Sequence, residues 1–229
     1  MIKTGSFTYS KHILLDKLRM DELQSILAKH CDSISIFVKT IDNSSIKFES
    51  YAELMEYDNF KKMRIKKLDI YGYKSNPWNE SIKLTFYAGS PRESSVDCTY
   101  TFSDTDEEAI FNSDISKFLD KAVYFHIPAL IVDWTALFLV FAAVFYLGHV
   151  ILPQNTISTY VAESMIATIL YALFVYLILP RLFPSVSFSW GEAIIYYKRI
   201  AMVQNILFCS IILAAVVGFF VNYISNRLF

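Results

Sequence analysis

Seven consecutive residues, 61–67, carry the densest positive charge in this chain of 229 residues. Five of them are basic: Lys61, Lys62, Arg64, Lys66 and Lys67. On a β-strand, Lys62, Arg64 and Lys66 would share one face, and the other two lysines would share the opposite face. Three aligned cations can bind the phosphate of a nucleotide, an oligonucleotide or a lipid headgroup. The alternatives are a lysine-protected edge strand and a contact with an anionic membrane surface.

A lone carboxylate, Glu163, interrupts a long apolar run in the second half of the chain. A carboxylate in lipid costs about 2.5–3.5 kcal/mol, so it should face water, a partner or a polar interior. Thr159 lies one helical turn earlier. A ring of such carboxylates would favour cations at the outer mouth of a pore, whereas a single one would be protonated or paired within a bundle. Gln204 and Asn205 would line the inner mouth or hydrogen-bond between helices.

Small and polar residues recur every fourth position near the C-terminus, at Ser210, Ala214, Gly218 and Asn222. On a helix they share one face, where small side chains let helix backbones approach closely and polar ones bond across the contact. The spacing indicates helix packing, with a partner helix either in the same chain or in another protomer. We expect a homo-oligomer.

Composition divides the chain into two unlike halves. Apolar residues make up 54% of the chain and charged residues 19%, which excludes a disordered, collagen-like or strongly cationic protein. Residues 1–121 hold 17 of the 21 Lys and Arg and 19 of the 22 Asp and Glu. The remaining 108 residues hold only seven charges, so the two halves need separate interpretations.

The second half has three apolar stretches of the length that crosses a bilayer, about 20 residues each. The expected spans are 134–152, 157–179 and 201–224. The distribution of Lys and Arg in the flanking loops places the N-terminal domain in the cytoplasm. The sequence therefore predicts a multi-pass protein of the cell inner membrane, with a transmembrane domain at 134–229 and an interfacial coupling helix at 117–133.

The first 116 residues read as a soluble α+β domain that ends where the coupling helix begins. Alternating apolar residues predict an antiparallel sheet of about five strands, and apolar residues at helical spacing predict two or three helices. The expected strands are 33–40, 46–49, 63–73, 82–87 and 96–102, and the expected helices are 16–30, 51–57 and 104–121. The predicted fold class is thus an α+β domain followed by an all-α bundle of three transmembrane helices.

Motifs of catalysis are missing from the sequence. It has no GxSxG, Walker A, GxGxxG, HExxH or CxxC pattern, and its four histidines are scattered. We therefore expect no enzyme activity, no catalytic residue, no cofactor and no metal. An unrecognised catalytic site in the N-terminal domain is the alternative.

One segment resembles a known family. Residues 183–191 (FPSVSFSWG), a following Tyr/Lys/Arg cluster, and a last apolar stretch ending in Val221-Asn222 are similar to bacterial membrane proteins of antiphage defence. The soluble-domain-first order resembles the membrane effector of Hailong-type defence. The resemblance implies a multimeric channel, a nucleotide-derived ligand made by a partner nucleotidyltransferase, and abortive infection. It transfers no individual binding residue.

Together these features predict an oligomeric membrane effector acting in antiviral defence. The expected function is a ligand-gated ion channel that senses a nucleotide or oligonucleotide signal and depolarises the membrane. The expected partners are the lipid bilayer, further copies of the chain, that ligand and a nucleotidyltransferase. The alternative is a membrane-tethered regulatory or scaffold protein without a pore.

Overall fold

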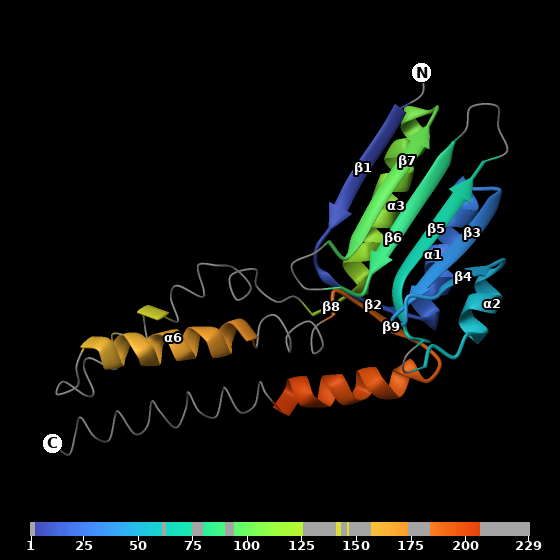
Figure 1. The fold of residues 1–229 in the computed structure, drawn as a ribbon. Helices are drawn as coiled ribbons and strands as arrows, with labels where there is room; N and C mark the ends of the chain where they lie inside the picture. Colours follow the sequence, from blue (N-terminus) through green and yellow to red (C-terminus); the bar gives the residue numbers. More distant parts are fainter. Residues whose placement is uncertain are drawn as a thin grey trace, which may run out of the picture.

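Six antiparallel strands form the main sheet, in the order β1-β7-β6-β5-β3-β4 (Figure 1). The computed structural model describes residues 3–60, 63–74, 80–89, 94–125, 141–142, 146, 157–173 and 184–206. The strands are β1 (Lys3–Tyr9), β3 (Ser33–Thr40), β4 (Ser45–Phe48), β5 (Ile65–Tyr73), β6 (Ser81–Tyr87) and β7 (Val96–Phe102). The sheet has one strand more than the sequence predicted, because β1 pairs with β7 along its whole length.

Cross-strand rows of the sheet are alternately apolar and polar. One row joins Val96, Phe86, Leu68 and Val38, all of them buried. The predicted alternation in residues 96–102 is confirmed, since every second side chain of β7 is buried. This period of two places one face of the sheet on a core and leaves the other face polar.

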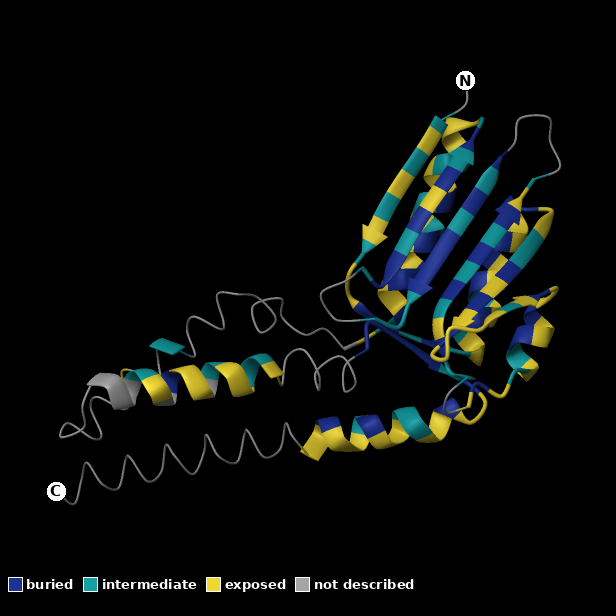
Figure 2. Cartoon of the chain, viewed as in Figure 1, coloured by how far each residue is buried: buried dark blue, intermediate teal, exposed yellow. Residues whose placement is uncertain are grey.

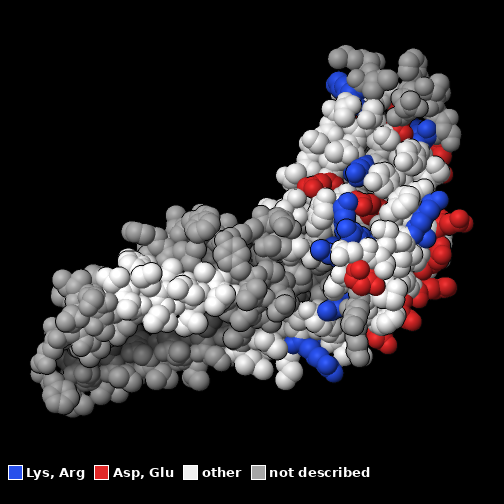
Figure 3. Space-filling model, viewed as in Figure 1, with Lys and Arg blue, Asp and Glu red and all other residues white. Residues whose placement is uncertain are grey.

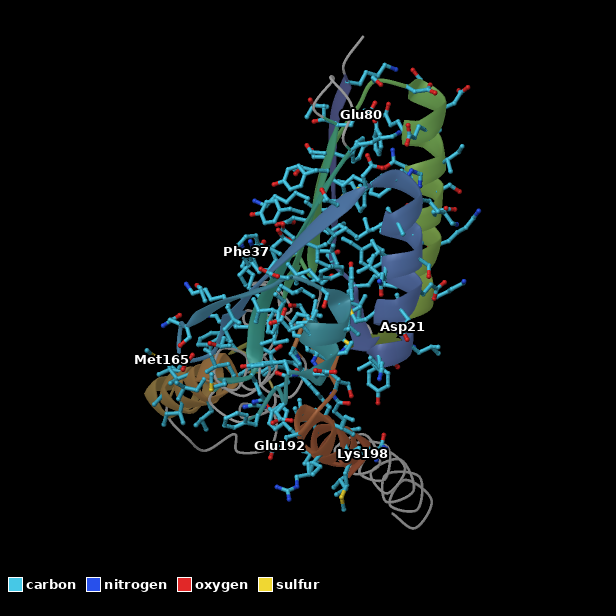
Figure 4. All side chains as sticks on the ribbon, turned by 90° about the vertical axis from the view of Figure 1, so that its right-hand side faces the viewer. Asp21, Phe37, Glu80, Met165, Glu192 and Lys198 are labelled. Carbon is cyan, nitrogen blue, oxygen red and sulfur yellow. The ribbon has the colours of Figure 1, made fainter. Side chains whose placement is uncertain are left out.

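Two helices cover the apolar face of the sheet, α1 (Lys17–His30) and α3 (Thr105–Ala122), while α2 (Tyr51–Glu56) lies near β4 (Figures 1 and 4). Figure 2 shows the buried residues along the strands and between the two layers. An aspartate caps each long helix: Asp16 accepts from the Arg19 N–H, and Asp104 accepts from the Asp106 N–H. On α1, Met20, Leu23, Ile26 and Leu27 are buried against the sheet, whereas Leu18 is exposed.

A second sheet of three strands joins distant parts of the chain. It contains β2 (His12–Asp16), β8 (Val123–Phe125) and β9 (Val186–Ser189), with β2 in the centre and parallel to β9. One face of it extends the main core, since Ile13, Leu15, Val186 and Phe188 are fully buried. The expected coupling helix is therefore interrupted, because α3 ends at Ala122 and the chain continues as a strand.

The expected bundle of three transmembrane helices is wrong for the part of the chain that the structure describes. No described helix is both long enough and apolar enough to cross a membrane. Of the second expected span, 157–179, the structure describes α6 (Ile157–Leu173), and residues 174–179 lie outside the described residues. The expected spans 134–152 and 201–224 lie mostly outside the described residues.

Several further predictions depended on those spans and are corrected with them. These are the ion channel, the multi-pass location in the inner membrane, and the defence role by membrane depolarisation. Residues 186–189 form β9 in the second sheet, and the chain continues as a helix over residues 193–206. The fold described by the structure is α+β with a six-stranded antiparallel sheet.

Glu80 makes stability depend on pH. Its side chain is only 3% exposed and accepts from both the hydroxyl and the N–H of Ser103, with the Lys74 Nζ 3.3 Å away. These groups, led by the Ser103 hydroxyl, lower the pKa of Glu80 although burial opposes them. A lowered pKa stabilises the fold above the ordinary glutamate value, and the stabilisation disappears as pH falls through the folded value.

We therefore expect Glu80→Gln to be less stable than the wild type at pH 7, with the difference shrinking as the pH falls below about 4. Urea unfolding at several pH values measures this difference. The control is Glu56→Gln, since Glu56 is exposed. A difference for Glu80→Gln that is independent of pH would contradict the prediction.

Candidate functional site

A β-bulge separates the basic residues that the sequence placed on one face. Thr40 pairs with Ile65 and Lys39 pairs with Lys67, so Lys66 is an extra residue on β5. Both Ile65 and Leu68 are buried as a result, and the simple alternation of the basic segment is lost. Lys61 and Lys62 lie outside the described residues.

Lys67 lies on the open face of the main sheet. Its Nζ is 2.8 Å from the Asp69 carboxylate and 5.4 Å from the centre of the Tyr87 ring. Burial lowers the pKa of Lys67, but the hydrogen bond and charge of Asp69 outweigh it, so the pKa lies above its usual value. Lys67 thus stays charged at neutral pH and shares its charge with a carboxylate.

The same open face carries aromatic rings among its charges. The Phe37 and Tyr71 rings meet edge to face at 5.6 Å, and the Lys83 Nζ lies 5.3 Å from the centre of the Tyr71 ring. Figure 4 shows Phe37 on the side of the sheet away from α1 and α3. In the space-filling view, basic and acidic side chains mix over this face (Figure 3). The face is polar and of mixed charge.

Arg64 leaves the sheet and contacts the helix at residues 193–206. Its guanidinium carbon lies 3.6 Å from the centre of the Tyr196 ring, which is the distance of a stacked cation–π contact. Stacking uses the flat face of a guanidinium, whereas its five N–H donors point outward in the plane. The arrangement therefore holds the Arg64 group in one orientation.

Arg64 and Arg199 line one pocket of about 540 Å³ between this helix and the chain at the end of β3 and the start of β5. The other described residues that line it are Ile41, Glu192, Ala193, Ile195 and Tyr196. Two guanidinium groups and one carboxylate give the lining a net positive charge. The pocket also lies at the N-terminus of the helix, whose dipole favours a nearby anion.

Local backbone contacts hold the two walls of this pocket together. Gly191 has φ +58°, and a Cβ there would lie 2.3 Å from the Asp58 carbonyl oxygen, so only glycine fits. The Glu192 N–H donates to that same carbonyl at 2.8 Å. The Asn59 Nδ2 donates to the Phe188 carbonyl at 2.8 Å. These bonds fix the start of the helix beside the segment that leads to Arg64.

The other predicted site residues are not brought to this pocket by the described part of the structure. Thr159 and Glu163 lie on α6, and their side chains are outside the description. Gln204 is buried and lines a different cavity, whereas the adjacent Asn205 is exposed. The predicted packing residues lie outside the described part of the chain: Ser210, Ala214, Gly218 and Asn222.

Sequence reasoning missed Glu192, Tyr196 and Arg199. The signal for two of them was present, because residues 196–199 read Tyr-Tyr-Lys-Arg, but this cluster was used only as part of the family resemblance. Only the pairing of β9 with β2 shows that the cluster lies against the basic end of β5. More than 125 residues of sequence separate the two walls of the pocket.

The expected likeness to defence membrane effectors stays a prediction, and it rests on residues 183–191 and the apolar stretches that follow. The structure places part of that segment in β9 and the adjoining helix, which gives it a structural role in this fold. The chain matches no family model, no curated protein and no solved structure in the comparisons with known proteins.

Proposed function

We propose that the protein is a binding module that recognises a small phosphate-bearing, nucleotide-like anion in the pocket of Arg64 and Arg199. The observation that carries the proposal is the convergence of two guanidinium groups on one pocket, one of them stacked on Tyr196. Guanidinium groups bind phosphate oxygens with paired, charge-assisted hydrogen bonds. An oriented pair can therefore hold a phosphate group at a defined position.

The remaining side chains of the pocket suit a nucleotide better than free phosphate. Ile41, Ile195 and the Tyr196 ring give an apolar wall for a flat base. Glu192 adds an acceptor for a ribose hydroxyl or a base amino group, while its charge would repel a bare anion. None of the described lining residues is a serine, cysteine or histidine, so this pocket supports binding.

Calorimetric titration of the purified chain with ATP, and separately with tripolyphosphate, tests the proposal. Each charge-assisted bond contributes about 1.5–3 kcal/mol, so Arg64→Ala and Arg199→Ala should each raise the Kd for ATP by about 10- to 100-fold. Arg64→Lys should fall between these variants and the wild type, since it keeps the charge but loses the planar fork. Raising the salt concentration should weaken binding as well.

Lys66→Ala is the matched control, because Lys66 is exposed, belongs to the same basic segment and does not line the pocket. It should change the Kd by less than about threefold, as expected for one screened surface charge. Equal losses in Lys66→Ala and Arg64→Ala would show a diffuse charge effect and contradict the pocket. No heat of binding from either probe at millimolar concentration would contradict the proposal as a whole.

The expectations about assembly and partners rest on the sequence alone. A homo-oligomer and a nucleotidyltransferase that supplies the ligand both stay predictions.

A further inference from the structure

A second cavity, of about 170 Å³, lies between the three-stranded sheet and the helix at residues 193–206. One face of the three-stranded sheet packs on the core. The opposite face of the same sheet supplies His12, Ser187 and Ser189 to this cavity. The helix supplies Lys198 and Gln204. Lys198 is exposed, so this side of the cavity reaches solvent, whereas His12, Ser187 and Gln204 are each more than nine-tenths buried.

His12 and Ser187 form a polar pair inside the cavity. The Ser187 Oγ lies 3.4 Å from the His12 Nε2, although 175 residues separate them in sequence. The parallel pairing of β2 with β9 brings them together, since Leu14 is opposite Ser187 and His12 is two residues before Leu14 on the same face. The carbonyl of Pro184 accepts a hydrogen bond from the His12 ring. In the neutral tautomer that carries its proton on the other ring nitrogen, Nε2 is the acceptor that faces the serine.

His12 is neutral at physiological pH. Burial lowers its pKa to about 4, while the bond to the Pro184 carbonyl acts in the opposite direction. The titratable groups that face it from the packed elements are Tyr124 of β8, and Tyr197 and Lys198 of the helix. Burial raises the pKa of Tyr197 to about 12, so it carries no charge at neutral pH.

We propose that Ser187 is a nucleophilic serine with His12 as its general base, in a site that accepts small acyl esters. Two parts of an acyl-transfer site meet in one cavity, a serine hydroxyl 3.4 Å from a neutral imidazole, and the side chain of Gln204 lines the same cavity. The cavity has a volume of about 170 Å³ and opens to solvent beside Lys198, so a small acyl ester can enter it from that side.

The reaction balances without any further reagent except water. The Ser187 Oγ forms a bond to the ester carbonyl carbon as its proton moves to the His12 Nε2. The tetrahedral oxyanion then expels the alcohol, which leaves with the proton from His12. Water attacks the acyl-serine in the same way, gives its proton to His12, and releases the carboxylic acid and the original serine.

A small dialkyl fluorophosphate tests the nucleophile directly, because the Ser187 Oγ would displace fluoride and keep the phosphoryl group. We expect peptide mass spectrometry to find the adduct on Ser187, and none at this peptide in Ser187→Ala. Ser6→Ala is the control, since Ser6 is an exposed serine on β1 that does not line the cavity. It should leave the labelling rate within about threefold, because it removes neither nucleophile nor base.

His12→Gln should slow the labelling by about 100-fold or more, the usual contribution of a general base. In the wild type, the rate should stay level from pH 8 to pH 5.5 and fall as the imidazole is protonated near pH 4. If His12→Gln does not fold, this wild-type profile replaces it. Absence of a Ser187 adduct in folded protein, an unchanged rate in folded His12→Gln, or a level rate through pH 4 would each overturn the proposal.

The ester site and the arginine pocket are independent in the experiments. Ser187 and His12 do not line the arginine pocket, and Arg64 and Arg199 do not line this cavity. Loss of ATP binding with labelling retained, or the reverse, therefore separates the two proposals.

Discussion

Replacing Phe188 by alanine is expected to lower the free energy of unfolding by about 3–5 kcal/mol, the usual cost of removing a buried aromatic ring. Phe188 is fully buried on β9, and its ring meets Trp190 edge to face at 5.7 Å. It is continuous with the core that α1, α3 and the main sheet enclose. The loss of unfolding free energy therefore has two parts. One is the lost transfer of the ring from water into the core, and the other is the cost of the cavity that the ring leaves behind.

Urea unfolding of Phe188→Ala measures this loss, and Ser189→Ala is the neighbouring control. Ser189 is at the next position of β9 and faces away from the core, so its replacement should change stability by less than about 0.5 kcal/mol. The comparison shows whether residues 186–189 are part of the folded core. Equal midpoints for the two variants would contradict the packing of β9 described above.

Local pattern was sufficient to predict several elements of the main sheet. The strand at 33–40 is β3 with the same bounds, and the strand at 96–102 is β7. Both contain apolar residues at every second position, and that period directly reports a sheet with one buried face. The helix at 104–121 appears as α3 with a shift of one residue, because Asp104 is its N-cap.

The sequence pattern could not predict features that depend on pairing between strands far apart in the sequence. The bulge at Lys66 exists only because β5 pairs with β3, so the face of each basic side chain depends on a neighbouring strand. Likewise, β9 has only four residues and follows an apolar region, so the sequence gives no separate signal for it. Its pairing with β2 identifies it as a strand. Apolar residues are also compatible with burial in either lipid or protein, so hydropathy alone does not distinguish the two.

The arginine pocket illustrates the same limit for function. Arg64 was one of five basic candidates of equal weight in the sequence. Its contact with Tyr196, and the position of Arg199 across the pocket, single it out. Arg64 and Tyr196 are 132 positions apart in the sequence, so no local motif can include them.

Asn59 is the residue that joins these distant segments, and Asn59→Ala is expected to cost about 2–5 kcal/mol of unfolding free energy. The side chain is 1% exposed and makes two hydrogen bonds of 2.8 Å, from its Nδ2 to the Phe188 carbonyl and from the Ile65 N–H to its Oδ1. Alanine would leave both buried backbone groups without these partners, at about 1–3 kcal/mol each. Alanine also fits the left-handed backbone of this position, φ 47°, less well than asparagine.

Asn43→Ala separates the cost of the backbone from the cost of the hydrogen bonds. Asn43 has a similar left-handed backbone, φ 66°, but it is exposed in the turn before β4. Its replacement should cost about 1 kcal/mol or less, and the excess in Asn59→Ala then belongs to the two buried bonds. Equal costs for the two variants, measured by urea unfolding, would show that the bonds add nothing.

The same variant connects the fold to the proposed ligand site. Asn59 fixes the segment before Arg64 to the strand that precedes Tyr196, so its loss should let the two walls of the pocket separate. Under conditions where Asn59→Ala remains folded, we expect its Kd for ATP to rise by about tenfold, because part of the binding energy must then re-form the pocket. An unchanged Kd would mean that the Arg64–Tyr196 contact alone keeps the pocket in place.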